Sequence, residues 1–160
     1  MARQLFFYCS ANNSPSDGNA ITVYYTVSEM NMKKAVEYTA VYGVGAVGYT
    51  LIEILWRGYS HWTMALTGGA CLMLVYLLEE RYSGEAMWKR CLAGSLIITT
   101  AELVVGFVVN ILLGWGVWDY SNQTLNVCGQ ICALYFILWF LLCIPGVKLC
   151  AGLRRIFGPH

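Results

Sequence analysis

Four long apolar runs constrain this chain more than any other feature. They cover residues 35–55, 62–78, 91–113 and 129–147. A helix that crosses the hydrocarbon core of a bilayer needs about 20 mostly apolar residues. Unpaired backbone groups are not tolerated in hydrocarbon, and no run shows the alternation of a membrane strand, so each run is predicted to be a helix. The sequence therefore predicts an all-α integral membrane protein, a four-helix bundle.

The composition agrees with a lipid environment. The 160 residues are 58% hydrophobic and 12% charged, whereas about a quarter of the residues of a soluble domain are charged. So few charges cannot coat a water-soluble globule, and we expect membrane lipid around the chain. The formal net charge of +1 gives no reason to expect a nucleic-acid partner.

The basic residues predict the orientation. Four crossings place both termini and the connection between the second and third runs on one side of the membrane. Nine of the ten lysines and arginines lie in these stretches, and only Arg57 lies on the other side. Cytoplasmic loops carry an excess of Lys and Arg. We therefore expect a multi-pass protein of the plasma membrane with both termini in the cytoplasm.

Two flanking segments differ from the transmembrane domain predicted over residues 33–150. Residues 1–32 are more polar, and Met30 and Met32 stand just before a lysine pair, as at a natural start. We expect this segment either to be disordered or to lie upstream of the true start. No small-x-small cleavage site follows the first run, which favours an uncleaved anchor over a signal peptide. Residues 151–160 are expected to form a basic cytoplasmic tail.

Glu102 lies near the middle of the third apolar run. Inserting a charged residue there costs about 2.5–3.5 kcal/mol, so such a residue is a functional candidate by default. One interpretation is a group that contacts a proton or a substrate in a cavity of the bundle. The other is an acid that is hydrogen-bonded to Tyr42, to a threonine or to a carbonyl group of a neighbouring helix. The sequence leaves both open.

Residues near Glu102 repeat at helical spacing. Glu102, Gly106, Asn110 and Gly114 recur every fourth residue, so an α-helix would place them on one side. We expect this stripe to face the inside of the bundle and to pack against another helix.

A second group of ionisable residues lies at the end of the first run. Glu53 and Arg57 are four residues apart, which favours a helical ion pair, and His61 follows at the same spacing if the helix continues. The structural interpretation, an anchor at the membrane surface that includes Asp119 of the other outer loop, is favoured over a functional one. Metal binding by His61 is not expected.

The GxGxxG pattern over residues 43–48 matches the dinucleotide fingerprint only in its letters. That fingerprint needs a strand before it and a helix start after it, whereas these glycines lie within an apolar run. Small residues there allow two helices to approach closely. We predict helix packing and no nucleotide site.

No pattern of an enzyme or of a cofactor site is present. The sequence lacks GxxxxGK[ST], HExxH and GxSxG, and its seven cysteines form no CxxC pair and no cluster with histidine. We therefore predict no enzyme, metal or cofactor, and free thiols that pack as small apolar groups. The mixed-charge connection over residues 79–90 is expected to be solvated and to be the place where a cytoplasmic partner would dock.

One set of residues resembles a known family. The pattern comprises Glu102, Gly106, the box Trp118-Asp119-Tyr120-Ser121, Asn126 and the segment Gly129-Gln130-Ile131-Cys132. It is similar to that of the bacterial ABC-transporter type IV family. The segment from Gly48 to Met64 also looks like small Firmicute and prophage-encoded relatives. Val127 departs mildly from the pattern, which usually has leucine there.

The resemblance and the polar residues support three hypotheses. The first is a permease-like subunit, which would need a separate ATPase and either homo-oligomerisation or another membrane subunit. The second is a non-transport scaffold or accessory protein, and the third, suggested by the prophage relatives, is a holin-like protein. The candidate functional residues are Glu53, Arg57, His61, Glu102, Asn110, Trp118, Asp119, Tyr120 and Asn126.

Overall fold

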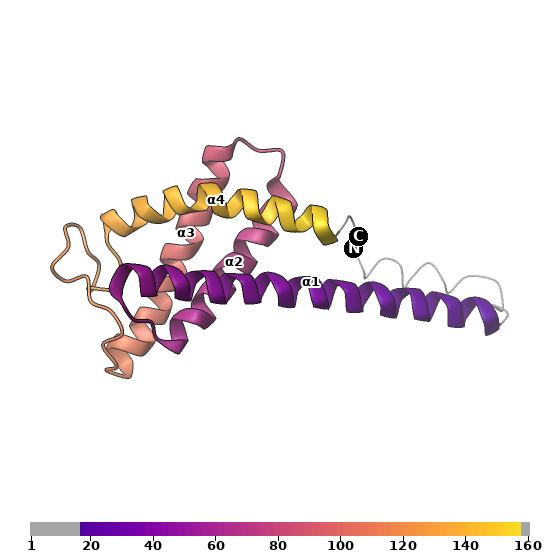
Figure 1. Cartoon of the computed structure of the whole chain (residues 1–160), viewed down its shortest axis with the longest axis horizontal. Helices are drawn as coiled ribbons and strands as arrows, with labels where there is room; N and C mark the ends of the chain where they lie inside the picture. Colours follow the sequence, from indigo (N-terminus) through magenta and orange to yellow (C-terminus); the bar gives the residue numbers. More distant parts are fainter. Residues whose placement is uncertain (1–16, 158–160) are drawn as a thin grey trace. The chain divides into compact units, whose positions relative to one another are not determined.

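The computed structural model describes residues 17–157, with side chains from residue 25 onward (Figure 1). Its regular elements are α1 (Asp17–Arg57), α2 (Trp62–Tyr82), α3 (Met87–Gly106), the π-helix η1 (Phe107–Leu112) and α4 (Ala133–Phe157). Strand-like pairing among these residues is limited to one bridge between Val127 and Ile131. The chain divides into two compact units, Met1–Val36 and Glu37–His160. The second unit contains α2 to α4 and the candidate site.

Four helical segments are long and apolar enough to cross a membrane. They are Tyr25–Arg57, Trp62–Tyr82, Met87–Leu112 and Ala133–Phe157. The predicted all-α fold with four membrane-spanning helices is thus confirmed, and the chain is a membrane protein. Which terminus faces which compartment stays a prediction.

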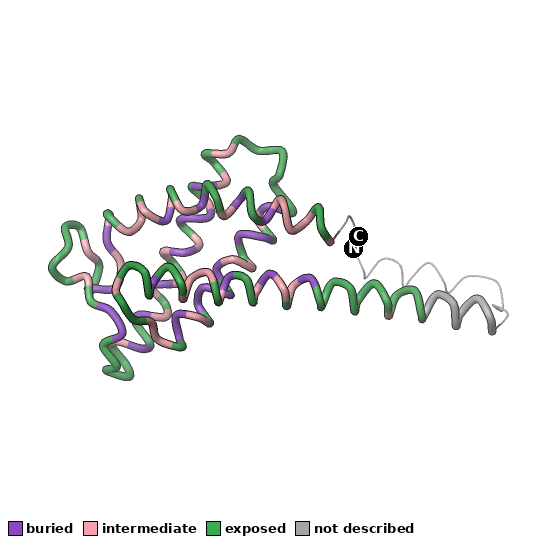
Figure 2. Tube along the Cα trace, in the orientation of Figure 1, coloured by how far each residue is buried: buried purple, intermediate pink, exposed green. Residues whose placement is uncertain are grey.

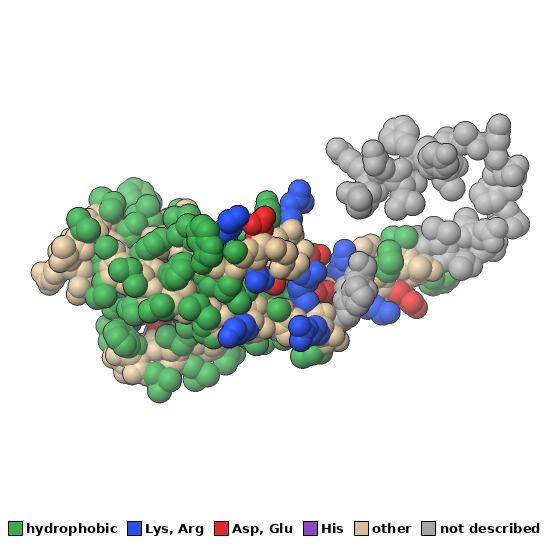
Figure 3. All heavy atoms as spheres, turned by 90° about the horizontal axis from the view of Figure 1, so that it is seen from above, with side chains coloured by type: hydrophobic (Ala, Val, Ile, Leu, Met, Phe, Trp, Pro, Cys, Tyr) green, Lys and Arg blue, Asp and Glu red, His purple; other side chains and the backbone are tan. Residues whose placement is uncertain are grey.

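The outer surface of these helices is suited to lipid. Large apolar side chains such as Leu55, Val47 and Leu112 are more than half exposed, and exposed stretches run along each helix (Figure 2). Hydrophobic side chains cover much of the visible face, and the Lys and Arg side chains gather away from its left end (Figure 3). Exposed apolar side chains of this kind would be unfavourable in water and are favourable in hydrocarbon.

The bounds of two helices differ from the predicted runs. α1 begins at Asp17, inside the segment expected to be polar, because no proline or further glycine interrupts the chain between Gly18 and Gly43. The part of that expectation that concerns residues 1–16 lies outside the described residues. α4 begins at Ala133 because Cys128 and Gly129 have φ angles of 52° and 68°, which a right-handed helix cannot contain. It then continues through Pro145 to Phe157, so residues 151–157 of the expected tail are helical.

One glycine of the GxGxxG pattern makes the close helix contact expected of it. A Cβ atom on Gly45 would lie 2.7 Å from the carbonyl oxygen of Gly68 and 2.6 Å from Cβ of Leu72 in α2. Only a residue without a side chain allows α1 and α2 to come so near. Gly43 and Gly48 have open space at the same position. The packing interpretation is therefore confirmed for Gly45 alone.

The core of the second unit lies among α1, α2, α3 and α4. Its buried residues include Val41, Tyr76, Cys91, Ile98 and Val147. The described cysteines are free, and all of them except Cys128 are buried. Thiols in such surroundings pack as small apolar groups.

Candidate functional site

Glu102 is bonded to two other helices. Its side chain is only 1% exposed. The Tyr49 hydroxyl of α1 donates to Oε1 at 3.1 Å, and the Trp139 indole Nε1 of α4 donates to Oε2 at 2.7 Å. The Tyr49 and Trp139 rings also stack, with centroids 5.7 Å apart. One carboxyl group on α3 thus joins α1 and α4.

Tyr42, one of the alternative partners that the sequence offered for Glu102, does not bond to it, and Tyr49 of the same helix does. The Tyr42 hydroxyl donates to the carbonyl oxygen of Leu66 at 3.0 Å. Tyr49 lies seven residues further along α1, which is about two helical turns. Depth along the helix therefore decides which tyrosine reaches the carboxyl group.

The predicted stripe on the third helix holds only in part. Glu102 and Gly106 are buried and Asn110 is partly buried, but Gly114 is exposed and lies beyond the helix with a φ angle of 67°. The reason is the π-helix η1, whose wider turns end the four-residue repeat after Gly106. A π-helical turn cannot be recognised from hydropathy alone.

Asn110 connects η1 to the loop of residues 113–132. Its Nδ2 donates to the Trp118 carbonyl oxygen at 3.0 Å and to Gln130 Oε1 at 2.7 Å, while its Oδ1 accepts from Val117 N at 2.7 Å. A Cβ atom on Gly106 would lie 2.8 Å from the Trp118 ring. The loop therefore packs directly on the helix.

Trp118 is buried within this loop and its position depends on a residue that sequence reasoning missed. The Trp118 Nε1 donates to the Gln130 carbonyl oxygen at 3.0 Å. Gln130 is 5% exposed, and its side chain meets Asn110. The sequence held one indication of its role. Gln130 belongs to the segment Gly129-Gln130-Ile131-Cys132 that resembles the family, and a side-chain amide that is buried next to an apolar helix needs hydrogen-bond partners.

Asp119 and Asn126 shape the outer part of the loop. Asp119 Oδ1 accepts from Ser121 N at 2.8 Å and from its Oγ at 2.5 Å, and these hydrogen bonds lower the pKa of Asp119. Asn126 donates to the carbonyl oxygens of Ser121 and Gln123 and accepts from Gly129 N. Both side chains bond within their own loop, which points to a structural role in this arrangement.

Tyr120 points from the loop towards α4. Its ring stacks on Tyr135 with centroids 4.3 Å apart and an interplanar angle of 19°. Burial is the main cause that raises the pKa of Tyr120 well above its usual range. Its hydroxyl therefore stays neutral at physiological pH.

Glu53 and Arg57 form the predicted ion pair at the end of α1. Ser60 Oγ donates to Glu53 Oε2 at 2.5 Å, and Arg57 Nη1 donates to the Val117 carbonyl oxygen at 3.1 Å. The guanidinium also lies 5.0 Å from the centre of the Tyr59 ring. Arg57 therefore reaches the loop through a carbonyl group of Val117, whereas the sequence suggested Asp119.

His61 does not belong to this group, because the condition for its alignment with Glu53 and Arg57, a helix that continues to His61, is not met. α1 ends at Arg57, and Gly58 then adopts a φ angle of 80°. His61 instead precedes α2, where its Nδ1 accepts from Thr63 N at 3.4 Å. Its ring lies 5.6 Å from that of Trp115. The chain turn at Gly58 moves the histidine onto the next helix.

A second buried polar cluster lies near the connection between α2 and α3. Arg90 Nη1 lies 2.7 Å from each Glu79 carboxylate oxygen, and Arg154 donates to the Glu79 carbonyl oxygen at 3.0 Å. Glu79 is only 3% exposed. The sequence had placed Glu79 and Arg90 in a solvated connection, which was wrong because both lie on helices that pack together.

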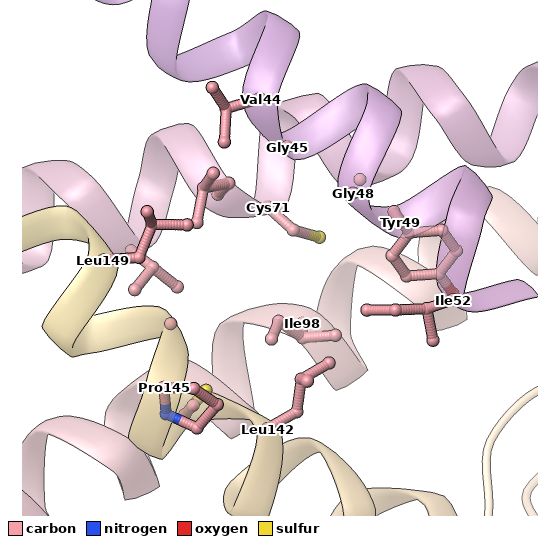
Figure 4. A pocket seen from close by; sticks show the side chains of 15 residues that line it. Val44, Gly45, Gly48, Tyr49, Ile52, Cys71, Ile98, Leu142, Pro145 and Leu149 are labelled. Carbon is pink, nitrogen blue, oxygen red and sulfur yellow. The ribbon is translucent and has the colours of Figure 1, made fainter. Parts of the chain in front are cut away.

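Two cavities lie between α1 and α4. The aromatic cavity, of about 370 Å³, is lined by Glu53, Trp56, Arg57, Tyr120, Tyr135 and Trp139 among others. The glycine cavity, of about 310 Å³, is lined by Gly45, Gly48, Cys71, Ile98 and Leu149 among others. Figure 4 shows α1 residues on one side of the glycine cavity, α4 residues on another, and Cys71 and Ile98 beside the space between them. Tyr49, Ile52, Leu142 and Pro145 line both cavities.

The geometry can be compared with known proteins. A family model described as Putative ABC-transporter type IV matches residues 22–156. The chain belongs to this family. The match includes all four candidate spans almost entirely, Glu102 and the loop that carries Trp118, so the resemblance seen in the sequence is confirmed. No curated protein and no solved structure matches the chain.

Proposed function

We propose that this chain is the permease-like membrane subunit of an ABC-type transporter in a bacterial plasma membrane, with both termini in the cytoplasm. The observation that carries the proposal is the family match over residues 22–156. The four candidate spans and the cavities between α1 and α4 support it, because a permease must offer a substrate a place inside the membrane domain.

The subunit would depend on a separate ATPase. The sequence holds no GxxxxGK[ST] motif, whose backbone amides cradle nucleotide phosphates in P-loop ATPases. We propose that the chain itself is not an enzyme. A second copy or another membrane subunit would complete the path, because four helices enclose little space.

We propose that Glu102 couples binding of the substrate to the positions of α1 and α4. Its two oxygens hold Tyr49 of α1 and Trp139 of α4, and both rings line the aromatic cavity. A substrate that displaces either ring changes the hydrogen bonds of the carboxyl group. Movement of α1 relative to α4 can therefore be linked to occupancy of the cavity.

The test is purification of the tagged chain from its own bacterium in mild detergent, followed by reconstitution with the ATP-binding subunit that co-purifies. We expect a stoichiometric ATPase whose ATP turnover rises when the membrane subunit is present. Glu102→Gln replaces one acceptor oxygen by a donor and should lower the stimulated turnover about tenfold, while Glu85→Gln on the exposed surface should not. Absence of any ATPase, or equal turnover of Glu102→Gln and the parent, would count against the proposal.

One observation favours a second function, that of a scaffold or accessory protein. Each carboxylate oxygen of Glu102 already has a donor, and Asn110 and Trp118 are likewise bonded within the chain. Such polar residues can serve helix packing alone. In that case Glu102→Gln would lower stability in detergent, and the purified chain would stimulate no ATPase.

A further inference from the structure

We propose that the aromatic and glycine cavities together form one groove between α1 and α4 that binds a lipophilic organic cation, with its charge among the aromatic rings and its apolar part in the glycine cavity. The inference rests on the proposed function and names the substrate class of the same site. The shared lining by Tyr49 and Pro145 makes the two cavities neighbours along one groove.

Four aromatic rings form a continuous wall at the charged end of the groove. Tyr120 stacks on Tyr135, the Tyr135 and Trp139 centroids are 6.4 Å apart, and Trp139 stacks on Tyr49. All four rings line the aromatic cavity. An aromatic face attracts a cation that lies within about 6 Å of its centroid, and several rings together are a recurrent site for alkylated ammonium groups.

The charges at this end favour a cation over an anion. Arg57 is the only basic residue in the lining of the aromatic cavity, and it is already neutralised by Glu53 and bonded to the Val117 carbonyl group. Behind the rings stands the Glu102 carboxyl group, held by Tyr49 and Trp139. Glu53 and Arg57 cancel each other within the lining, so the preference for a cation comes from the ring faces and from the Glu102 carboxyl group behind them.

The other end of the groove fits the apolar part of such a compound. Gly45 and Gly48 contribute no side chains, and the remaining lining residues of the glycine cavity are almost all apolar. Both volumes, about 310 and 370 Å³, fall within the range of about 300–1,000 Å³ that holds drug-sized ligands. A compact lipophilic cation fits that size, and a two-chain bilayer lipid is too large.

The test uses two elongated probes of similar size that differ in the charge of their head group, octyltrimethylammonium and octanesulfonate. The full chain is reconstituted in nanodiscs of anionic lipid, and saturable binding is measured by equilibrium dialysis against empty nanodiscs. We expect saturable binding of octyltrimethylammonium and at least about tenfold weaker saturable binding of octanesulfonate. Equal binding of both probes, or no saturable binding of the cation, would overturn the proposal.

Two variants locate the site. Tyr135→Leu removes one ring from the wall and should weaken cation binding about fivefold, whereas Tyr82→Leu, an exposed tyrosine outside the groove, should leave it unchanged. A Cβ atom on Gly48 or Gly43 would meet no atom within 4 Å, but only Gly48 lines the glycine cavity. Gly48→Leu should therefore abolish binding, whereas Gly43→Leu, which adds the same side chain outside both cavities, should leave it unchanged. If each variant binds like its control, the groove is not the site.

A further measurement separates this inference from the proposed function and from a lipid occupant. If phosphatidylcholine nanodiscs abolish the saturable binding, the groove holds a choline headgroup and the proposal is wrong. If the cation fails to bind while a partner ATPase is still stimulated, the substrate class is wrong and the permease proposal stands. If the cation binds but no ATPase is found, the binding site stands without the transporter.

Discussion

The two ends of the bundle over residues 37–157 are held together by different chemistry. At the loop end, formed by residues 58–61 and 113–132, neutral amides and aromatic rings make most of the contacts between elements, as in the bond between Asn110 and Gln130, and the ion pair of Glu53 and Arg57 lies within α1. At the turn end, formed by residues 83–86 and the adjoining helix ends, the main contact is the buried ion pair of Glu79 and Arg90. The aromatic cavity adjoins the loop end through Tyr120, and its rings can shift without separating the Glu53–Arg57 pair, because both members of that pair lie on α1.

This difference in contacts determines which end of the bundle can move more easily. Separating a buried ion pair leaves an uncompensated charge, which is strongly unfavourable. A neutral hydrogen bond contributes only about 0.5–1.5 kcal/mol, and stacked rings can slide. The turn end is therefore expected to hold α2, α3 and α4 together while α1 and α4 adjust near the loop end.

The largest expected effect concerns the side of the membrane on which each end lies. Cys128 is exposed at the loop end, and Lys89 is exposed near the turn end. In a Cys9→Ser background, a membrane-impermeant maleimide added to intact cells should label Cys128 fully and should not label a Lys89→Cys variant that also carries Cys128→Ser. Labelling of both positions from outside would contradict the predicted orientation.

The next effect concerns the ion pair at the turn end. Glu79→Ala leaves Arg90 buried without its partner and should lower the free energy of unfolding by about 3–5 kcal/mol. The matched control is Glu85→Ala, which removes the half-exposed pair with Lys89 and should cost at most about 1 kcal/mol. Reversible unfolding in mixed micelles measures both, and similar values for the two variants would mean that the Glu79 pair is not desolvated.

The smallest effect concerns the neutral network at the loop end. Asn110→Leu removes the partners of Val117 N, of the Trp118 carbonyl oxygen and of Gln130, and it should cost about 1–3 kcal/mol. Asn122→Leu changes an exposed loop residue and should stay within about 0.5 kcal/mol. If Asn110→Leu destabilises the chain more than Glu79→Ala, the turn end is not the more strongly held of the two.

Hydropathy predicted the helices well because membrane spans need no long-range information. The length of an apolar run and the absence of polar partners in lipid are enough to define a helix. Glu102 was recognised for the same reason, since a carboxyl group in such a run is costly wherever its partners come from. Its partners Tyr49 and Trp139 were not predictable, because they lie 53 and 37 residues away in sequence.

Other parts of the candidate site depended on local geometry that sequence periodicity does not report. The turn at Gly58 separates His61 from Glu53, and the π-helix η1 separates Gly114 from the stripe. The pairing of Glu79 with Arg90 spans eleven residues across a connection, so counting charges could not reveal it. Side-chain contacts between helices, and irregular turns within them, are what the sequence alone left open.

Pro145 of α4 lines both cavities and weakens the helix beside the groove. Proline has no amide hydrogen, so the carbonyl group of Leu141 lacks its usual intrahelical donor and α4 loses one backbone bond at this point. α4 continues through Pro145 as one helix, but its backbone is less constrained there, beside residues that line both cavities. A change in the bend of α4 at Pro145 would widen or narrow the space for a guest molecule without breaking another backbone hydrogen bond.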